Sequence, residues 1–206
     1  AYFKTKAECL LNKATPLMEI YKVESKNAFA AFMSSSTKLK GNRRRILSAL
    51  PIHTISDELL LKILKHNDVA AKDISNIQSA MKEQKQIIET ILEDNVFEDE
   101  IQKISKEDFN NISPTLCLAD SFYENKIYYN YEEYLEHLKL TKKYAKDMPN
   151  YKLNTDNKHT FKNIQILICE KNWVMVSKAN SPSIHFVIHH PKLRNAIENF
   201  IPPVVE

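Results

Sequence analysis

Apolar residues recur every three or four positions in four stretches of the first half, which is the spacing of amphipathic helices. Thr15 and Pro16 resemble an N-cap followed by proline at the first helical position, and Ser25 and Ser56 precede the next two runs. The fourth stretch, Ala71–Asp94, predicts a long helix that packs within the chain, with a dimer helix as the alternative. The apolar positions are Leu17, Ile20 and Tyr21; Ala28, Phe29, Phe32 and Met33; Leu59, Leu60, Ile63 and Leu64; and Ile74, Ile77, Met81, Ile88 and Ile91.

The periodicity changes after an acidic stretch, Glu93–Glu100, which we interpret as a connector. Short apolar runs at Leu116–Leu118 and Ile127–Tyr129 are typical of strands. Asn130, with Glu133 three positions later, forms a capping-box pattern that predicts the start of a helix. One face of that helix carries Tyr131, Tyr134, Leu135, Leu138, Thr141, Ala145 and Met148.

Four more strands are predicted in the last third, at Tyr151–Thr155, Asn163–Cys169, Trp173–Ser177 and Ile184–His189. The short connection after Cys169 predicts a hairpin, and Pro191 predicts the start of a final helix. We expect an α/β or α+β fold, with a helical N-terminal half followed by a mixed sheet of about 4–6 strands flanked by helices. The change in periodicity divides the chain into a helical subdomain, residues 1–112, and an α/β sensor-like subdomain, residues 113–206.

The composition excludes several enzyme classes. Gly41 is the only glycine, and Walker A loops and Rossmann fingerprints both need several. Cys9, Cys117 and Cys169 lie far apart, which predicts reduced thiols rather than disulfides or a metal site. Because residues 1–6 lack a signal peptide and no apolar run is long enough to span a membrane, we expect a cytoplasmic protein. The sequence starts at Ala1 rather than Met, so we expect further residues upstream.

Charge is distributed unevenly along the chain. Residues 1–52 contain ten Lys or Arg against three acids, and residues 53–112 contain seven against thirteen, which predicts attraction between the two segments. The densest basic patch could contact the phosphate backbone of a nucleic acid, or its arginines could pair with the acidic segment. Its residues are Lys38, Lys40, Arg43, Arg44 and Arg45.

The candidate catalytic motifs are incomplete. His185 and His189 are about 13 Å apart along the predicted strand, too far to share a metal ion, so we expect no metal site. His190 and Lys192 begin an H-x-K-x4-D pattern, but Ile197 stands where the aspartate is needed. A G-x-S-x-G nucleophile elbow requires glycines that the chain lacks. We therefore expect no catalytic residues and no cofactor, and a protein that is not an enzyme.

Aromatic and polar residues on or beside the predicted strands form a candidate ligand-binding set. Small-molecule sites are mostly apolar with a few directed polar groups, and this inventory fits that description. The alternative is an ordinary core in which Tyr and Trp make hydrogen bonds. The candidate residues are Tyr128, Tyr129, Gln165, Trp173, Lys178 and His185.

Five segments of the chain share the pattern of one known family. They are Phe161–Ile166, Lys171–Lys178, Ser181–Arg194, Arg44–Pro51 and Tyr128–Tyr134. In these segments the chain resembles bacterial helix-turn-helix transcriptional regulators, in the region C-terminal to their DNA-binding headpiece. It implies a regulatory domain for effector sensing or oligomerisation, whose DNA-binding domain lies N-terminal to this sequence.

The expected partners follow from that resemblance. They are a second copy of the chain in a homodimer, a small-molecule or peptide effector, and DNA bound through the N-terminal domain, with no membrane contact. Two alternatives stay open: a direct nucleic-acid-binding protein that uses the 38–45 patch, and a protein-interaction module without a ligand.

Overall fold

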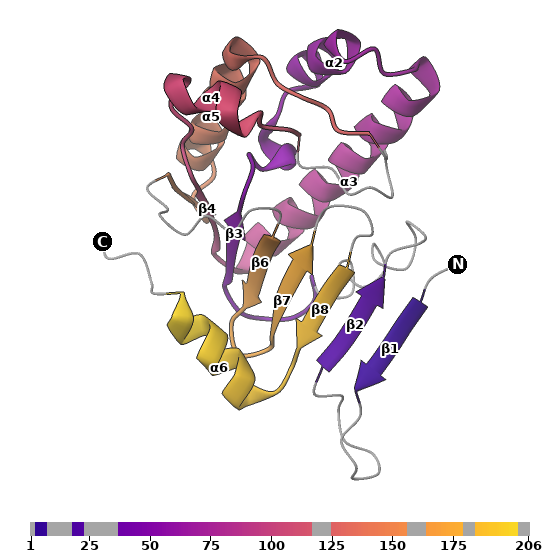
Figure 1. The fold of residues 1–206 in the computed structure, drawn as a ribbon. Helices are drawn as coiled ribbons and strands as arrows, with labels where there is room; N and C mark the ends of the chain where they lie inside the picture. The colour runs from indigo at the N-terminus through magenta and orange to yellow at the C-terminus, as the bar shows by residue number, and fades with distance from the viewer. Residues whose placement is uncertain are drawn as a thin grey trace.

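A computed structural model describes residues 3–7, 18–22, 37–116, 125–155, 164–178 and 184–201, with the fold shown in Figure 1. One mixed sheet of eight strands has the order β1-β2-β8-β7-β6-β3-β4-β5. The strands are β1 (Phe3–Ala7), β2 (Met18–Lys22), β3 (Arg43–Leu47), β4 (Phe97–Ile101), β5 (Tyr151–Asn154), β6 (Ile164–Cys169), β7 (Trp173–Lys178) and β8 (Ile184–Ile188). The helices are η1 (Ile52–Thr54), α2 (Asp57–His66), α3 (Ala71–Asp94), α4 (Lys106–Ile112), α5 (Tyr131–Asp147) and α6 (Pro191–Phe200). The predicted α/β class, a mixed sheet flanked by helices, is confirmed.

The sheet has a parallel part and an antiparallel part, which meet at β3. β3, β4 and β5 are parallel neighbours, because a helical crossover joins each to the next: η1, α2 and α3 first, then α4 and α5. On its other side β3 pairs with β6 in the antiparallel sense, and the pairs from β6 through β7, β8 and β2 to β1 are also antiparallel. Strands from both sides of the boundary predicted after residue 112 lie in this one sheet.

Helices cover both faces of the sheet. α3 lies on one face and α6 on the other, while α2, α4 and α5 gather at the end toward which β3 runs (Figure 1). On the α6 face, Ile46 packs with Ile166, Ile168 and Ile201 in a small apolar cluster. The α3 face carries two larger clusters. One lies around α2 and the first half of α3, and the other lies around the second half of α3 and the strands.

Local sequence patterns predicted several elements correctly. The Ser56 side chain accepts a hydrogen bond from the Leu59 amide at the start of α2. α3 spans the predicted Ala71–Asp94, with its apolar face buried inside the chain. The predicted capping box is present at Asn130, where both of its hydrogen bonds form. The β6–β7 hairpin and the proline-initiated helix α6 are also confirmed.

Two expectations for the first half are wrong, because tertiary strand pairing overrides local pattern. Met18–Lys22 is strand β2 rather than helix, since its backbone pairs with β1 and β8 on either side. The acidic connector contains strand β4, which pairs with β3 and β5. Strand β3, which was not predicted, begins in the basic patch at Arg43. The helix predicted after Ser25 lies outside the described residues.

Two short strands were predicted at Leu116–Leu118 and Ile127–Tyr129, and the described residues of this region form one isolated bridge. Thr115 and Tyr128 form this isolated antiparallel bridge, with backbone hydrogen bonds on either side of it. Residues 117 and 118 lie outside the described part of the chain. The bridge places Tyr129 and Asn130 directly before α5.

Candidate functional site

An ion pair between two neighbouring parallel strands forms the base of a buried polar cluster. Arg45 of β3 and Asp99 of β4 are register partners, so their side chains leave the same face of the sheet. The guanidinium Nε lies 2.7 Å from Oδ1 of Asp99, and Nη2 lies 2.8 Å from Oδ2. Asp99 is completely buried, so this two-point geometry compensates much of the cost of removing its charge from water.

Two aromatic rings complete the surroundings of this ion pair. The Tyr151 hydroxyl, from the start of β5, donates a hydrogen bond to Oδ2 of Asp99. Burial, together with the charge of Asp99, raises the pKa of Tyr151 well above its usual value, so the hydroxyl remains a donor. The Arg45 guanidinium also lies over the Phe97 ring, 5.1 Å from its centroid.

His53 of η1 lies against this ion pair, and Arg45 fixes its tautomer. Nη2 of Arg45 is 3.3 Å from Nδ1 of His53. Because a guanidinium can only donate, Nδ1 must accept, and the proton of the neutral ring is on Nε2. Burial, followed by the charge of Arg45, holds the pKa of His53 well below 6.5. Nε2 is therefore a donor, and it is buried without a hydrogen-bond partner among the described residues.

Tyr144 of α5 brings a second buried polar atom to the same place. Its ring packs edge-on against His53 and Tyr151, with centroid distances of 5.3 Å and 4.9 Å. Its hydroxyl is buried and has no hydrogen-bond partner within the described part of the chain. Burial raises the pKa of Tyr144 to about 12, so the hydroxyl stays neutral. The His53–Tyr144 cluster, defined as Arg45, His53, Asp99, Tyr144 and Tyr151, thus contains two buried donors without an acceptor among the described residues.

A second polar network beside this cluster is fully satisfied, and it fastens η1 to α5. The Tyr129 hydroxyl lies 2.7 Å from Nδ1 of His137, whose Nε2 is 3.2 Å from Oγ1 of Thr54 and 3.3 Å from the carbonyl oxygen of Pro51. The hydroxyl oxygens of Thr54 and Thr141 are 2.7 Å apart and form a hydrogen bond. Burial lowers the pKa of His137 to about 3, so its ring is neutral. This network is structural, because it leaves no polar atom to offer to a ligand.

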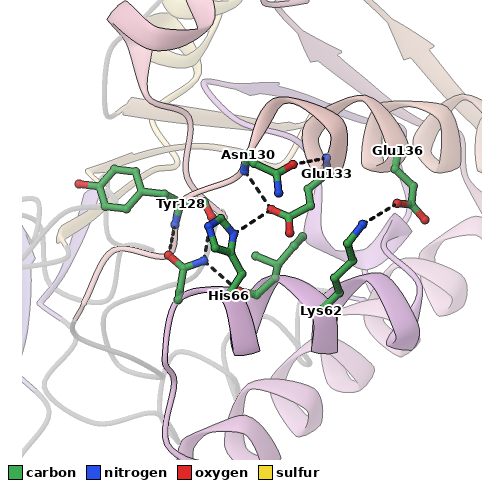
Figure 2. Close-up of polar contacts among 8 residues, drawn as sticks. Lys62, His66, Tyr128, Asn130, Glu133 and Glu136 are labelled. Atoms are coloured by element: carbon green, nitrogen blue, oxygen red, sulfur yellow. Dashed lines mark hydrogen bonds and ion pairs between the residues drawn. The ribbon is translucent and has the colours of Figure 1, made fainter.

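A third set of polar contacts holds α2 against the start of α5, as Figure 2 shows. The buried Glu133 carboxylate accepts a hydrogen bond from the Asn130 amide, and it lies 3.2 Å from Nδ1 of His66. The Asn67 side chain, at the end of α2, donates to the carbonyl of Tyr128 and accepts from its amide. These contacts fix the entry into α5.

The structure separates the residues of the ligand-binding set predicted from the sequence. Gln165, Ser177 and His185 are neighbours on one face of β6, β7 and β8, and Nδ1 of His185 lies 2.7 Å from the Ser177 hydroxyl. Burial lowers the pKa of His185 to about 4.

The remaining four residues of the set lie elsewhere. Trp173 is buried at the other end of β7, and Lys178 is exposed on the opposite face of the sheet. Tyr129 belongs to the His137 network, and Tyr128 is exposed. The set therefore contains two residues on one face of the sheet, Gln165 and His185, which lie on either side of Ser177, and its other members lie apart from them.

The arginines of the basic patch are engaged inside the molecule. Arg43 is buried and donates to the carbonyl oxygens of Leu39 and Gly41. Arg44 pairs with Glu100 and donates to the Ile201 carbonyl at 3.0 Å, while Arg45 pairs with Asp99. The predicted attraction between the basic and acidic segments is thus the pairing of β3 with β4. Lys38 and Lys40 are the exposed members of the patch.

Sequence reasoning missed the His53–Tyr144 cluster because its members come from η1, α5 and three strands and form no local motif.

Among the described residues, no group of three or more His, Cys, Asp or Glu is arranged to hold a metal ion. None of the helices in these residues has an apolar stretch long enough to cross a membrane. Comparison of the chain with protein families, curated proteins and solved structures finds no match.

Proposed function

We propose that the chain is the regulatory domain of a bacterial helix-turn-helix transcriptional regulator, and that it senses a small effector without catalysing a reaction. The observation that carries the proposal is the pair of buried donors, Nε2 of His53 and the Tyr144 hydroxyl, which lack acceptors among the described residues. Leaving a buried donor unsatisfied costs about 1–3 kcal/mol. A ligand with an acceptor oxygen would recover that cost on binding.

The chemistry of the cluster favours binding over catalysis. A general base needs an available lone pair and a pKa near the working pH. The Nδ1 lone pair of His53 faces Arg45, and the pKa of the ring is held well below 6.5. The carboxylate of Asp99 is occupied by Arg45 and by the Tyr151 hydroxyl. His53 and Asp99 therefore lack the available lone pair that a general base needs.

The position of the cluster suggests how binding of an effector would change the packing of the helices. Ligands of α/β proteins commonly bind beyond the carboxyl ends of parallel strands, and η1 follows the carboxyl end of β3. η1 contacts α3, and Thr54 ties η1 to α5 through His137 and Thr141. An effector that prefers one position of η1 would therefore shift the packing of both helices, by no more than its differential affinity for the two states.

Thermal unfolding against a metabolite library tests this function, with Tyr144→Phe as the discriminating variant. The substitution removes only a hydroxyl that has no partner in the described structure, so the ligand-free melting temperature should change little. An effector that binds at the cluster should raise the melting temperature of the wild-type protein and raise that of Tyr144→Phe less. If no compound stabilises the wild-type protein, an interaction module without a ligand is the better description.

The same proposal includes a homodimer and DNA binding through an N-terminal domain, since operator half-sites usually require two-fold symmetry. Sedimentation equilibrium of the chain measures the first of these. If the molecular mass stays that of a monomer up to a protein concentration of about 100 µM, dimerisation by this domain is contradicted, because a specific dimer has a dissociation constant well below that concentration. Sequencing of the encoded residues upstream of Ala1 tests the second.

A further inference from the structure

α5 carries a continuous lysine face on the side of the helix that points away from the core. Lys139, Lys142, Lys143 and Lys146 are all exposed. At about 100° per residue, their spacing of three, four and seven confines them to roughly 100° of the helix circumference. The opposite side of α5 is buried through His137 and Thr141. The four residues are called the α5 lysine face below.

No ion pair engages a lysine of this face within the described part of the chain, and the exposed acids Glu136 and Asp147 lie along one edge of it. The ion pairs that α5 makes there, Lys62 with Glu136 and His66 with Glu133, both involve its first half. No ion pair joins Lys143 to Asp147, although both residues are described and four positions apart. The α5 lysine face is therefore a positive surface available to an external anion.

The stability of the helix does not account for four lysines on one face. Like charges three or four positions apart repel each other, and Lys139–Lys143 and Lys142–Lys146 are both such pairs. The helix dipole favours cations only within the last turn, which includes Lys146 but neither Lys139 nor Lys142. The opposite-charge pairs Glu136–Lys139 and Lys143–Asp147 offset part of this repulsion, and a polyanion that contacts several lysines at once would relieve the rest.

We propose that the α5 lysine face binds the phosphate backbone of a nucleic acid without reading its sequence. Lys139 and Lys146 are separated by about 10 Å along the helix axis, a distance over which a DNA duplex carries several phosphates. Lysine binds phosphate as a point charge and needs no fixed geometry. This surface is distinct from the 38–45 patch, whose arginines are engaged by Glu100, Asp99 and backbone carbonyls.

An anionic membrane fits the α5 lysine face less well. Helices that bind membranes insert an apolar face into the acyl boundary. The large apolar residues of α5, including Tyr134 and Leu138, are buried in the core, and Leu135 is its exposed large apolar side chain. Contact through charge alone suits a phosphate backbone, which requires no insertion.

Fluorescence anisotropy with a labelled DNA duplex of mixed sequence tests the proposal. Release of counterions from four phosphate contacts predicts a slope of about −3.6 in a plot of log affinity against log salt, or about a 150-fold loss of affinity between 50 and 200 mM salt. The test variant changes all four lysines of the face to glutamine, which keeps a good helix former at each position. The matched control changes Lys65, Lys72, Lys82 and Lys103, which are exposed on other elements, to glutamine and so alters the net charge equally.

The proposal expects the test variant to bring the slope close to zero, while the control keeps most of it. Three results would overturn it: no binding by the wild-type chain at 50 mM salt, equal losses in both variants, or stronger binding to vesicles containing phosphatidylserine than to DNA. Circular dichroism of both variants must show an intact fold before the slopes are compared. Because effector binding at the His53–Tyr144 cluster plays no part in this measurement, the two proposals can fail independently.

Discussion

Arg45 and Asp99 occupy register-matched positions on adjacent parallel strands and form a two-point ion pair, with atom separations of 2.7 Å and 2.8 Å. The pair stands between the sheet and the helices that cover it, where Asp99 is wholly buried. Arg45 also fixes the tautomer of His53, so the ion pair determines which nitrogen of that ring is a donor. The polarity of the candidate site thus depends on a contact between β3 and β4.

Breaking this ion pair should be costly. Asp99→Asn leaves the Arg45 guanidinium facing a neutral amide, and we expect the free energy of unfolding in urea to fall by about 3 kcal/mol. Replacing both partners, as Arg45→Met with Asp99→Leu, removes the uncompensated charge. The double variant should therefore lose less than the sum of its single changes. Additive losses would show that the two side chains do not stabilise each other.

Stability should decline in mild acid because three buried histidines are neutral in the folded state. Burial lowers the pKa of His137 to about 3 and that of His185 to about 4, and it holds that of His53 well below 6.5. Below pH 6.5 the unfolded chain binds protons that the folded chain cannot, so the free energy of unfolding falls as pH falls. His137 and His185 together should give a slope of about 2.5 kcal/mol per pH unit near pH 5, and His53 should add to it.

A single substitution checks this assignment of the slope. Urea titrations between pH 7 and pH 4.5 should show a shallower dependence on pH in His185→Gln than in the wild-type protein, by up to about 1.3 kcal/mol per pH unit, since one titrating group is removed. A slope that does not change in this variant would mean that His185 is protonated in the folded protein as readily as in the unfolded one.

Gly41 should not tolerate a side chain. Its φ of +133° lies in a region that L-residues rarely adopt, and an added Cβ would lie 2.7 Å from the carbonyl oxygen of Glu170. We expect Gly41→Ala to lower the free energy of unfolding by at least about 2 kcal/mol, measured by chemical denaturation. A variant with wild-type stability would show that the loop before β3 can move away from the β6–β7 hairpin.

The capping box of α5 should contribute more than the surface ion pair beside it. Asn130→Ala removes the hydrogen bond from the Glu133 amide to the Asn130 side chain and should cost about 1 kcal/mol. Lys62→Ala breaks an exposed pair with Glu136, and its effect should stay within about 0.5 kcal/mol. Thermal unfolding of the two variants side by side checks this ranking, and equal losses would contradict it.

Local patterns in the sequence were sufficient for elements whose signals lie within a few residues. The cap at Ser56, the capping box at Asn130 and the proline that begins α6 each predicted a boundary found in the structure. β3 and β4 escaped prediction because Arg43–Arg45 and Glu98–Glu100 resemble solvated charge runs. Their strand conformation results from pairing between segments more than fifty positions apart, which no local pattern records.

The candidate site was harder to predict than the fold. The sequence neighbours of His53, Ile52 and Thr54, are not titratable and form no motif with it. The residues that surround it in space come from other parts of the chain. The one relevant signal in the sequence is the excess of basic residues in the first segment and of acids in the second, which predicted their attraction. That signal could not indicate which charges would be buried or which side chain they would orient.

The pairing of β2 with β8 has a consequence for how the protein is made. Met18 and Ile188 are register partners 170 positions apart, so β2 leaves the ribosome long before β8, its neighbour on one side, has been synthesised. Contacts between such distant segments slow folding, because a long loop must close before they form. During translation the edge of β2 that later pairs with β8 is therefore unpaired. An unpaired strand edge favours aggregation, and a chaperone that covers it would protect the nascent chain.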